Sequence, residues 1–470
     1  TADTVMQRLE SLRSGDIDYR SGRVYAYTYD AGRSADRLGK QAFSSFLTEN
    51  ALDPTVFPSL LRFEKDIVAM VSAHLNGPEG TVGSFTSGGT ESILCAVKAA
   101  RDYARLTKPH IEHPEIVLPT TAHAAFHKAA SYFGLRIKLV AVDPVTMAAV
   151  PALISAAISE DTILVVGSTP SYAHGVIDPI REMAAIAQAR DVLFHVDACV
   201  GGFLLPYWRR LGCDVPDFDL SVPGVTSLSV DLHKYAFCPK GASLVLYTKP
   251  ALRAAQTFAC SDWTGYTVVN PTVQSSRSGG PLAAAWAVIH HIGDDGYLEI
   301  ARSILHGKQQ LIDAIEQIDG LRLLGRPDFC MVAAARDADG PSVFVVCDEM
   351  KQRGWYVQPQ FAYDNSPENI HFSLHPGNAV KVPAMAQDLA AATEAARAVE
   401  MDTALAQQVA AMFGGDTAFD DSTVSQLLAF AGVQGTALPE RMAPVNNLLN
   451  VLPVSVREKL LKGFFNALFA

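Results

Sequence analysis

The sequence predicts an α/β fold with a mainly parallel sheet and a smaller second lobe. Short runs rich in Val, Ile and Leu alternate along the chain with segments whose apolar residues recur at helical spacing. Near-continuous apolar strands are typical of a sheet that helices cover on both faces. Because 470 residues are too many for one simple core, we expect two or more lobes.

The composition excludes several classes of protein. Apolar residues make up 49% of the chain and charged residues 19%, as in an ordinary soluble enzyme. The net charge is −11 with no long Lys/Arg run, so we expect no nucleic-acid partner. The seven cysteines are scattered and form no CxxC pair, which favours a reducing, cytoplasmic location without disulfides or a metal site. Neither a transmembrane run of about 18 apolar residues nor a leader is visible.

We expect three parts along the chain. Residues 1–55 are polar and tyrosine-rich, and such a segment wraps over a larger lobe or over a partner subunit. Residues 56–319 form the large lobe, and residues 320–470 form a smaller C-terminal α+β lobe.

The apolar pattern places the elements of these lobes. A first helix begins near Val56. Strands are expected at 115–118, 137–142, 162–168, 192–198, 227–230 and 242–247. Helices are expected at 178–189, 281–291 and 297–318. The C-terminal lobe should contain strands at 342–347 and 370–374 and helices at 382–400 and 456–469. The last helix has one apolar face, which packs on the body or contacts a membrane or an oily substrate.

The stretch Ser227–Gly241 carries the first candidate for chemistry. A strand-like run ends at His233 and Lys234, and aromatic, Pro and Gly residues follow, as in a walled loop. A lysine among apolar neighbours can have its pKa lowered by desolvation and then act as an amine nucleophile that forms a Schiff base. The alternative is a surface lysine that happens to follow a histidine.

The stretch Gly83–Ser92 is a candidate anion site. Small residues and Ser/Thr side chains precede a segment of helical spacing, so free backbone N–H groups point in one direction and suit a phosphate. The sequence fits neither a Walker loop nor GxGxxG. A plain N-cap is the alternative. The residues concerned are Thr86, Ser87, Gly88, Gly89 and Thr90.

Further candidates follow predicted strands, where the loops of a parallel sheet carry functional side chains. They are His123, Tyr172 and Asp197. Pyridoxal phosphate needs an amine for its aldehyde, an anion site for its phosphate and a carboxylate at its ring nitrogen. Lys234, the Thr86–Thr90 loop with His233, and Asp197 would supply these, and His123 could stack on the ring. Singly, Asp197 could be a helix cap and His123 a core histidine.

The motifs together resemble the group II pyridoxal-phosphate decarboxylases, and among these the sphingosine-1-phosphate lyases. The residues that carry the resemblance are Thr86-Ser-Gly-Gly-Thr-Glu-Ser92, Val196-Asp-Ala198, Ser229-Val-Asp-Leu-His-Lys-Tyr235 with Pro239-Lys-Gly241, Gly167–Asp178 and Ser276-Arg-Ser-Gly-Gly280. The resemblance covers about residue 20 to beyond 400. It implies the fold-type I transferase architecture, with a seven-stranded sheet, a homodimer with shared active sites, and an N-terminal segment that reaches the partner.

By this resemblance, Lys234 binds the cofactor aldehyde, Asp197 pairs with the ring nitrogen and His123 stacks on the ring. Tyr172 matches a tyrosine associated with catalysis, and Tyr29 and Lys240 match residues at the phosphate end of the substrate. A cation just past the Schiff-base lysine suits an anionic substrate. The implied reaction cleaves a phosphorylated sphingoid base to a long-chain aldehyde and phosphoethanolamine.

One residue departs from the lyase pattern. Asp53 stands where those lyases carry a histidine that faces the substrate phosphate, and a carboxylate there would repel a phosphate. An amino-acid decarboxylase with the same cofactor is therefore the alternative function. A third alternative is a pyridoxal-binding protein without catalysis, which the presence of Lys234, Asp197 and Tyr172 disfavours.

Overall fold

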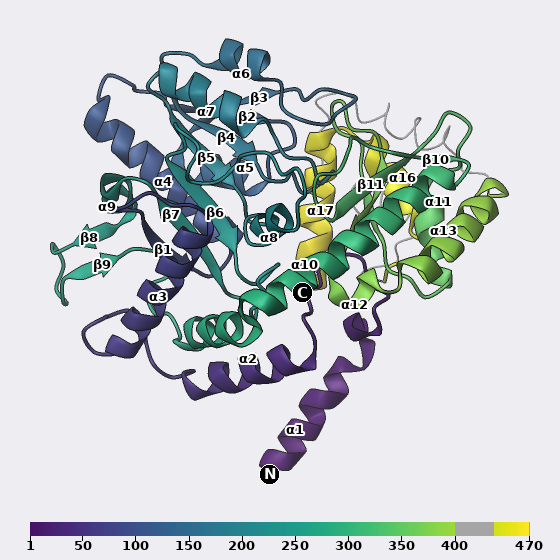
Figure 1. Cartoon of the computed structure of the whole chain (residues 1–470), viewed down its shortest axis with the longest axis horizontal. Coiled ribbons are helices and arrows are strands. Elements are labelled where there is room, and N and C mark those ends of the chain that lie inside the picture. Colours follow the sequence, from purple (N-terminus) through teal and green to yellow (C-terminus); the bar gives the residue numbers. More distant parts are fainter. Residues whose placement is uncertain (400–436, 470) are drawn as a thin grey trace.

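The structure, a computed structural model, describes residues 1–399 and 437–469 (Figure 1). Its centre is a seven-stranded sheet in the order β1-β7-β6-β5-β4-β2-β3. Only β7 runs antiparallel to its neighbours, β1 and β6. The strands are β1 (Val82–Thr86), β2 (Glu115–Pro119), β3 (Arg136–Val140), β4 (Thr162–Ser168), β5 (Leu193–Asp197), β6 (Ser227–Asp231) and β7 (Ser243–Tyr247). The predicted α/β fold with a mainly parallel sheet is confirmed.

The sheet is buried on both faces because its strands are apolar at successive positions. In β4, Val165 belongs to the main hydrophobic core, whereas Leu164 and Val166 belong to a second core. Successive strand side chains point to opposite faces, so a continuous apolar run needs a cover on each side. Residues of α4 (Gly89–Thr107) and α5 (Ala125–Phe133) build the second core, and residues of α3 (Pro58–His74), α6 (Pro151–Ala157) and α7 (Ile180–Ala189) join the main core.

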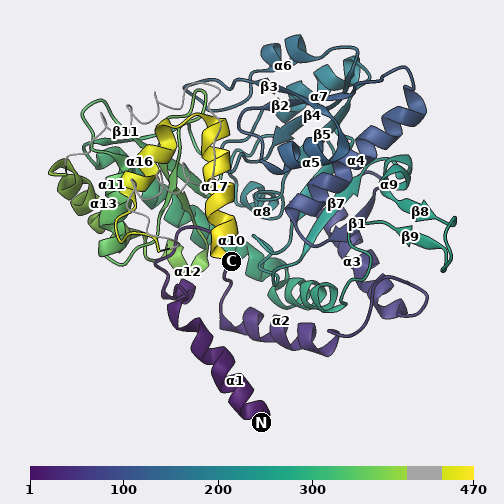
Figure 2. The same ribbon diagram turned by 180° about the vertical axis from the view of Figure 1, so that it is seen from behind.

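The long helix α10 (Gly280–Gln317) runs between the two lobes (Figures 1 and 2). It contains the two predicted helices 281–291 and 297–318, which meet at Gly293, where φ is +62°. That left-handed conformation is one that glycine adopts without strain. The remaining elements of the large lobe are α8 (Leu205–Arg210), α9 (Pro250–Gln256) and the hairpin of β8 (Phe258–Cys260) and β9 (Val268–Asn270).

The C-terminal lobe is built on a four-stranded antiparallel sheet in the order β10-β11-β13-β12. Its strands are β10 (Leu321–Leu323), β11 (Met331–Arg336), β12 (Gln358–Gln360) and β13 (Asn369–Ser373). Its helices are α11 (Val343–Gln352), α12 (Pro376–Ala379), α13 (Val382–Arg397), α16 (Ala443–Val451) and α17 (Val454–Leu468). Residues 400–436 and 470 of the predicted 320–470 lobe lie outside the described residues. The same holds for residue 400, the last position of the predicted 382–400 helix.

The predicted strand at 342–347 is wrong, because this segment forms the start of helix α11. Val343, Phe344, Val345 and Val346 are all buried. A short run that is apolar on every side shows no period, so the sequence cannot distinguish a buried strand from a buried helix.

The N-terminal segment lies against the C-terminal lobe of its own chain. Tyr25 is fully buried, with its ring 6.1 Å from Trp355 and 6.2 Å from Phe372, and its carbonyl accepts a hydrogen bond from Ser373 N. By contrast, α1 (Ala2–Ser11) has no buried residue and projects from the body in both views (Figures 1 and 2). Short 3-10 turns at Leu12–Gly15 and Tyr19–Ser21 precede α2 (Arg33–Ser45), which packs on α10.

Candidate active site

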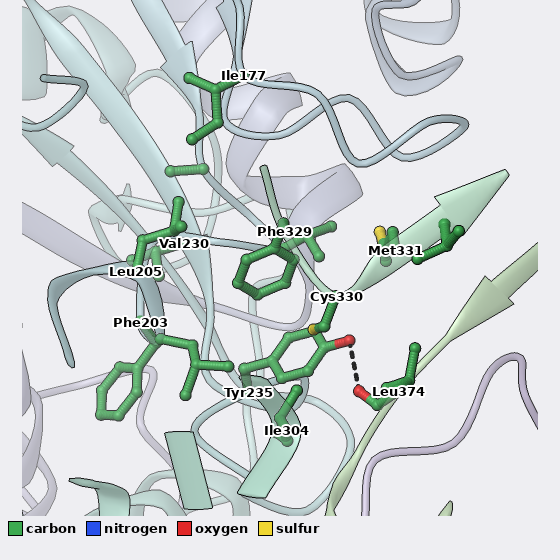
Figure 3. Packing of buried hydrophobic residues seen from close by; sticks show 14 of the residues in the cluster. Ile177, Phe203, Leu205, Val230, Tyr235, Ile304, Phe329, Cys330, Met331 and Leu374 are labelled. Atoms are coloured by element: carbon green, nitrogen blue, oxygen red, sulfur yellow. Dashed lines mark hydrogen bonds between the residues drawn. The ribbon is translucent and has the colours of Figure 1, made fainter. Parts of the chain in front are cut away.

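Lys234 is fixed in place by its neighbour Tyr235. The Tyr235 side chain is fully buried where the two lobes meet, with its ring edge-on to Phe329 at 5.0 Å (Figure 3). Its hydroxyl donates a hydrogen bond of 2.9 Å to the carbonyl oxygen of Leu374 in the C-terminal lobe. A buried aromatic ring with a satisfied hydroxyl holds the turn after β6 rigidly, so Lys234 emerges at a defined point.

Lys234 lies in a cavity of about 350 Å³ at the carboxyl ends of the parallel strands. The cavity wall brings together most of the predicted cofactor residues. They are Ser87, Gly88, Gly89, Thr90, His123, Tyr172, Asp197, His233 and Lys234. Thr86 is the last residue of β1, and its buried hydroxyl lies 2.6 Å from Ser92 Oγ, so it supports the loop from behind. Strand ends at a sheet edge are where α/β proteins bind ligands.

The expectation of a lysine with a lowered pKa is wrong for the cofactor-free chain. Lys234 Nζ forms an ion pair of 2.9 Å with Oδ2 of Asp231, a carboxylate that is only 2% exposed. Burial lowers the pKa of Lys234, but the opposed charge of Asp231 outweighs burial and raises the pKa above its ordinary value. Lys234 is therefore a protonated ammonium before the cofactor binds.

Asp231 is the main site residue that the sequence reasoning missed. It stands in the quoted motif, three residues before Lys234, at the end of the apolar strand β6. A charged residue within a strand that is otherwise buried was the available signal, since such groups are rarely buried without a partner. Its Oδ1 has no hydrogen-bond partner among the described residues, which marks the cavity floor as an incomplete polar site.

Asp197 is held by a short hydrogen-bonded chain. Its Oδ1 accepts bonds from Cys199 N at 3.1 Å and Ser229 Oγ at 3.4 Å. Ser229 Oγ lies 3.1 Å from Nε2 of the fully buried His195, whose pKa burial lowers to about 4. Because the imidazole stays neutral, it places no second charge beside the carboxylate, and Oδ2 is left for a further partner.

The loop before α4 is shaped by Glu91 and Gly89. One carboxylate oxygen of Glu91 accepts a 2.6 Å bond from Ser87 N, and the other accepts bonds from the N–H groups of Val273 and Gln274. At Gly89 a Cβ atom would lie 2.8 Å from Asp231 Oδ2, so a side chain would collide with the cavity floor. The first N–H groups of α4 have no acceptor within the helix, an arrangement that can bind an anion.

His123 and Tyr172 lie on the other side of the cavity. The His123 ring is exposed, and its Nδ1 accepts a bond from Ala125 N at 3.2 Å, so one ring face is free for stacking. The Tyr172 hydroxyl donates a 2.8 Å bond to Gln358 Oε1, and its ring stacks on His371 with centroids 4.5 Å apart. Burial raises the pKa of Tyr172 above its ordinary value, so its phenol is neutral.

Tyr29 and Lys240 are brought together near the cavity. Lys240 Nζ lies 4.7 Å from the centroid of the Tyr29 ring, within the range of a cation–π contact. Tyr29 in turn packs edge-on to Tyr235, next to Lys234. Asp53 is not part of this group. It is exposed, and its Oδ1 accepts bonds from the backbone N and the hydroxyl of Thr55 in its own turn.

The residues that line the site therefore fit pyridoxal phosphate. Lys234 shares one cavity with Asp231, Asp197 and His123. Asp231 Oδ1 has no hydrogen-bond partner among the described residues, and Asp197 accepts its bonds through Oδ1, which leaves Oδ2 for a ligand. One face of the His123 ring is free for stacking. The start of α4, with Gly88 and Gly89, lies on the same wall, where its N–H groups can bind the cofactor phosphate. Ser168, whose buried Oγ also lacks a partner among the described residues, is a further wall residue that the sequence did not single out.

Comparisons with known proteins agree with this geometry. The family model of the pyridoxal-dependent decarboxylase conserved domain matches residues 17–333. A second model, named for a C-terminal HTH domain of pyridoxal-dependent enzymes, matches residues 384–467. The sphingosine-1-phosphate lyase of Dictyostelium discoideum is 43% identical over 356 residues, which cover 76% of this chain and 66% of that protein. The lyase of Arabidopsis thaliana is 38% identical over 402 residues, which cover 84% and 72%.

Solved structures show the same relationship. The sphingosine-1-phosphate lyase of Burkholderia pseudomallei superposes with a TM-score of 0.80 at 35% identity, covering 89% of this chain and 96% of that one. Glutamate decarboxylase of Lactobacillus brevis has a TM-score of 0.73 at 19% identity, which shows the shared fold alone. This chain spans about two thirds of the length of the curated relatives. It belongs to the pyridoxal-dependent decarboxylase family and, within it, to the sphingosine-1-phosphate lyases.

Proposed function

We propose that the protein is a pyridoxal-phosphate-dependent carbon–carbon lyase. Its substrate would be a phosphorylated long-chain amino alcohol, which it would cleave to a long-chain aldehyde and phosphoethanolamine. The strongest support is that Lys234, Asp197 and His123 line one cavity. The loop of Ser87 to Thr90, which suits a phosphate, lines the same cavity. Relatives that are named sphingosine-1-phosphate lyases at 35–43% identity support the choice of substrate.

Each residue has a defined task in this proposal. Lys234 would hold the cofactor covalently and release it to the substrate amine, while the N–H groups that open α4 bind its phosphate. Asp197 would keep the ring nitrogen protonated, so that the bound cofactor acts as an electron sink for the carbon–carbon cleavage. His123 would hold the ring by stacking on its open face.

Tyr172 would orient the substrate hydroxyl. Because the phenol proton is donated to Gln358, the phenol oxygen faces the cavity as a hydrogen-bond acceptor. Its raised pKa keeps it neutral, and an amide oxygen is a poor proton acceptor. Tyr172 would therefore position the substrate hydroxyl by accepting a hydrogen bond from it, and would not itself take up the proton.

Tyr29 and Lys240 would bind the substrate phosphate. Lys240 is the cation nearest the Schiff-base lysine along the chain, and Tyr29 holds its ammonium by the cation–π contact. A charge-assisted bond to phosphate is the strong kind of polar contact.

We further propose that the enzyme works as a cytoplasmic homodimer. The single chain leaves Phe258, Trp263, Tyr266 and Val269 of the β8–β9 hairpin about half exposed, along with the apolar residues of α1. Such patches are commonly covered by a partner, and light scattering of the purified protein tests this. None of the helices in residues 1–399 and 437–469 has the length and apolarity needed to span a membrane.

One experiment separates the candidate activities. Purified protein is incubated with pyridoxal phosphate and a phosphorylated sphingoid base, or with a panel of amino acids, while long-chain aldehyde and carbon dioxide are both measured. Release of aldehyde supports the lyase, whereas carbon dioxide from an amino acid would establish a decarboxylase. Visible absorbance that disappears in Lys234→Ala confirms the cofactor anchor, and colourless wild-type protein after incubation would overturn the scheme.

A further inference from the structure

Two serines and a histidine form a buried polar row beside Asp197 in the central sheet. His195 and Asp197 lie two residues apart on β5, and the parallel strand β6 pairs Ser227 with His195 and Ser229 with Asp197. Side chains two positions apart on a strand point to the same face of the sheet. All four side chains are buried. Buried polar groups in an apolar sheet are rarely found without hydrogen-bond partners.

Hydrogen bonds link the members of this row. Ser227 Oγ lies 2.8 Å from His195 Nδ1, and Ser229 Oγ lies 3.1 Å from His195 Nε2. Ser229 Oγ also lies 3.4 Å from Asp197 Oδ1, which is the longest contact of the row. The Cys199 thiol donates a hydrogen bond of 3.3 Å to Ser229 Oγ, and burial raises the pKa of this thiol, so it keeps its proton.

The numbers of donors and acceptors fix the direction of these bonds. A carboxylate only accepts, so Ser229 donates its hydroxyl proton to Asp197. Ser229 Oγ must then accept from His195, which places the imidazole proton on Nε2. Nδ1 becomes an acceptor for the hydroxyl proton of Ser227. The opposite tautomer would turn the Ser229 proton away from Asp197 and leave the Ser227 proton without an acceptor among the described residues.

The imidazole of His195 is held in place and is neutral. The Phe126 ring of α5 packs edge-on against it, with ring centroids 5.8 Å apart. Burial lowers the pKa of His195 to about 4. A protonated imidazole would give Asp197 a cation of its own and weaken the attraction of the carboxylate for a protonated ring nitrogen. Neutral donors hold Oδ1 without this competition.

We propose that His195 and Ser229 are positioning residues for the cofactor. They hold Oδ1 of Asp197, so that Oδ2 accepts from the protonated ring nitrogen, and Ser227 sets the tautomer of His195. This inference rests on the proposed function, in which Asp197 keeps that nitrogen protonated. Neither His195 nor Ser229 is a wall residue of the described cavity, so both act through Asp197.

The tautomer is tested first, in cofactor-free protein. NMR of protein labelled with ¹⁵N in its histidines distinguishes a protonated from an unprotonated ring nitrogen. The signals of His195 are those that disappear in His195→Phe. We expect a protonated Nε2 and an unprotonated Nδ1 at pH 7. A proton on Nδ1 would reverse the chain of bonds and overturn the proposal, whatever reaction the enzyme catalyses.

The second test measures cofactor binding rather than turnover. Cofactor-free protein is titrated with pyridoxal phosphate and with the analogue in which a C–H group replaces the ring nitrogen. The wild type should bind pyridoxal phosphate at least about tenfold more tightly, because the analogue cannot make the charge-assisted bond to Asp197. In His195→Phe and in Ser229→Ala we expect affinity for pyridoxal phosphate to fall about tenfold. Affinity for the analogue should stay within about twofold.

Matched variants make the result specific. His195→Gln keeps an N–H donor for Ser229 and should recover most of the affinity. His74→Phe removes a histidine bonded to the carbonyl of Phe203, and Thr393→Ala removes a buried hydroxyl within α13. Both controls should bind the two ligands as the wild type does.

The possible failures are distinguishable. Equal losses for both ligands, or no loss, would mean that His195 and Ser229 do not act through Asp197 and would overturn the proposal. If His195→Phe does not fold, Ser229→Ala decides the same question. A wild type that binds both ligands equally would instead overturn the role of Asp197 in the proposed function, and this proposal with it.

Discussion

Asp231 Oδ2 lies 2.9 Å from Lys234 Nζ at the floor of the cavity. The same carboxylate lies 3.7 Å from His233 Nε2 and directly below Gly89 at the start of α4. Lys234 must be neutral to attack an aldehyde, so this ion pair opposes the first step of cofactor attachment. It also keeps a buried ammonium paired until the cofactor arrives, which avoids an uncompensated charge in the cavity.

Replacing Asp231 by Asn should therefore make Lys234 more reactive in the cofactor-free protein. The substitution removes the largest influence that raises the pKa of the Lys234 ammonium, whereas burial continues to lower that pKa. We expect pyridoxal without its phosphate to attach to Lys234 about tenfold faster at pH 7.5. Borohydride trapping followed by mass spectrometry of the Lys234 peptide measures the rate.

The matched control is Asp217→Asn, which removes a surface carboxylate paired with Arg181. It should leave the rate unchanged. An unaltered rate in Asp231→Asn as well would mean that the ion pair does not control the nucleophile, and the role given to Asp231 would be wrong.

Lys240 predicts a pH dependence of phosphate binding. Burial and the neighbouring charge of Lys234 lower the pKa of Lys240 to about 8. The ammonium is therefore charged below pH 8 and neutral above it. Affinity for an alkyl phosphate should fall about tenfold between pH 7 and pH 9.5, because one charge-assisted hydrogen bond to the phosphate is lost.

The variant Lys240→Arg removes that dependence, because a guanidinium stays charged throughout this range. Calorimetric titration with butyl phosphate at both pH values measures the effect, and Lys249→Arg in the N-cap of α9 is the control. A fall in affinity that persists in Lys240→Arg would assign the titration to another group.

Gln358 should position Tyr172 for the reaction. Gln358 and His371 are paired across β12 and β13, and together they hold the hydroxyl and the ring of Tyr172. Gln358→Met keeps the volume but removes the acceptor, so the phenol proton turns into the cavity. We expect kcat for aldehyde release to fall about tenfold with KM within twofold, since an orienting contact to the reacting hydroxyl is lost.

A rescue distinguishes positioning from general damage. Gln358→Glu restores an acceptor oxygen and should recover most of kcat, while Gln352→Met on α11 should behave as the wild type. Equal losses of kcat in Gln358→Met and Gln358→Glu would indicate disturbed packing instead.

The sequence predicted the site residues that follow strand ends and missed those that depend on three-dimensional partners. Lys234, Asp197 and His123 could be found because the ends of parallel strands meet at one edge of a sheet. The sequence does not show that the pKa of Lys234 is raised, because that shift comes from its ion pair with Asp231. The turn that brings the two side chains together is visible only in the structure. Likewise, the order of residues does not show that Tyr172 is held by strands almost two hundred positions later.

Two other sequence predictions, for Asp53 and for residues 342–347, depend on local contacts that the sequence does not show. The Asp53 carboxylate is taken up by Thr55 two residues away, a side chain–backbone bond that Asp forms readily in turns. The suggestion that this position faces the substrate phosphate stays a prediction. At 343–347 the sequence shows only apolar residues, and burial on all sides of the first turns of α11 removes the period that separates helix from strand.

Asp178 predicts a stability effect that depends on pH. Its carboxylate accepts bonds from Ser168 N at 2.8 Å and Ala149 N at 2.9 Å, which fixes the loop that carries Tyr172. Burial raises its pKa to about 6 from an ordinary value of 3.8, so the folded protein holds this proton more tightly than the unfolded chain. The stability that the protonated Asp178 contributes to the folded state is complete below pH 3.8 and is lost as the pH rises through 6.

Asp178→Ala leaves two buried N–H groups unpaired and should lower the free energy of unfolding by about 2–4 kcal/mol. The decrease in unfolding free energy caused by this substitution should be about 1 kcal/mol larger at pH 5 than at pH 7, because the wild type has the protonated Asp178 to lose at pH 5. Urea unfolding at both pH values measures it, with exposed Asp3→Ala as control. A loss that is larger at pH 7 would mean that Asp178 is stabilised as the ionised carboxylate.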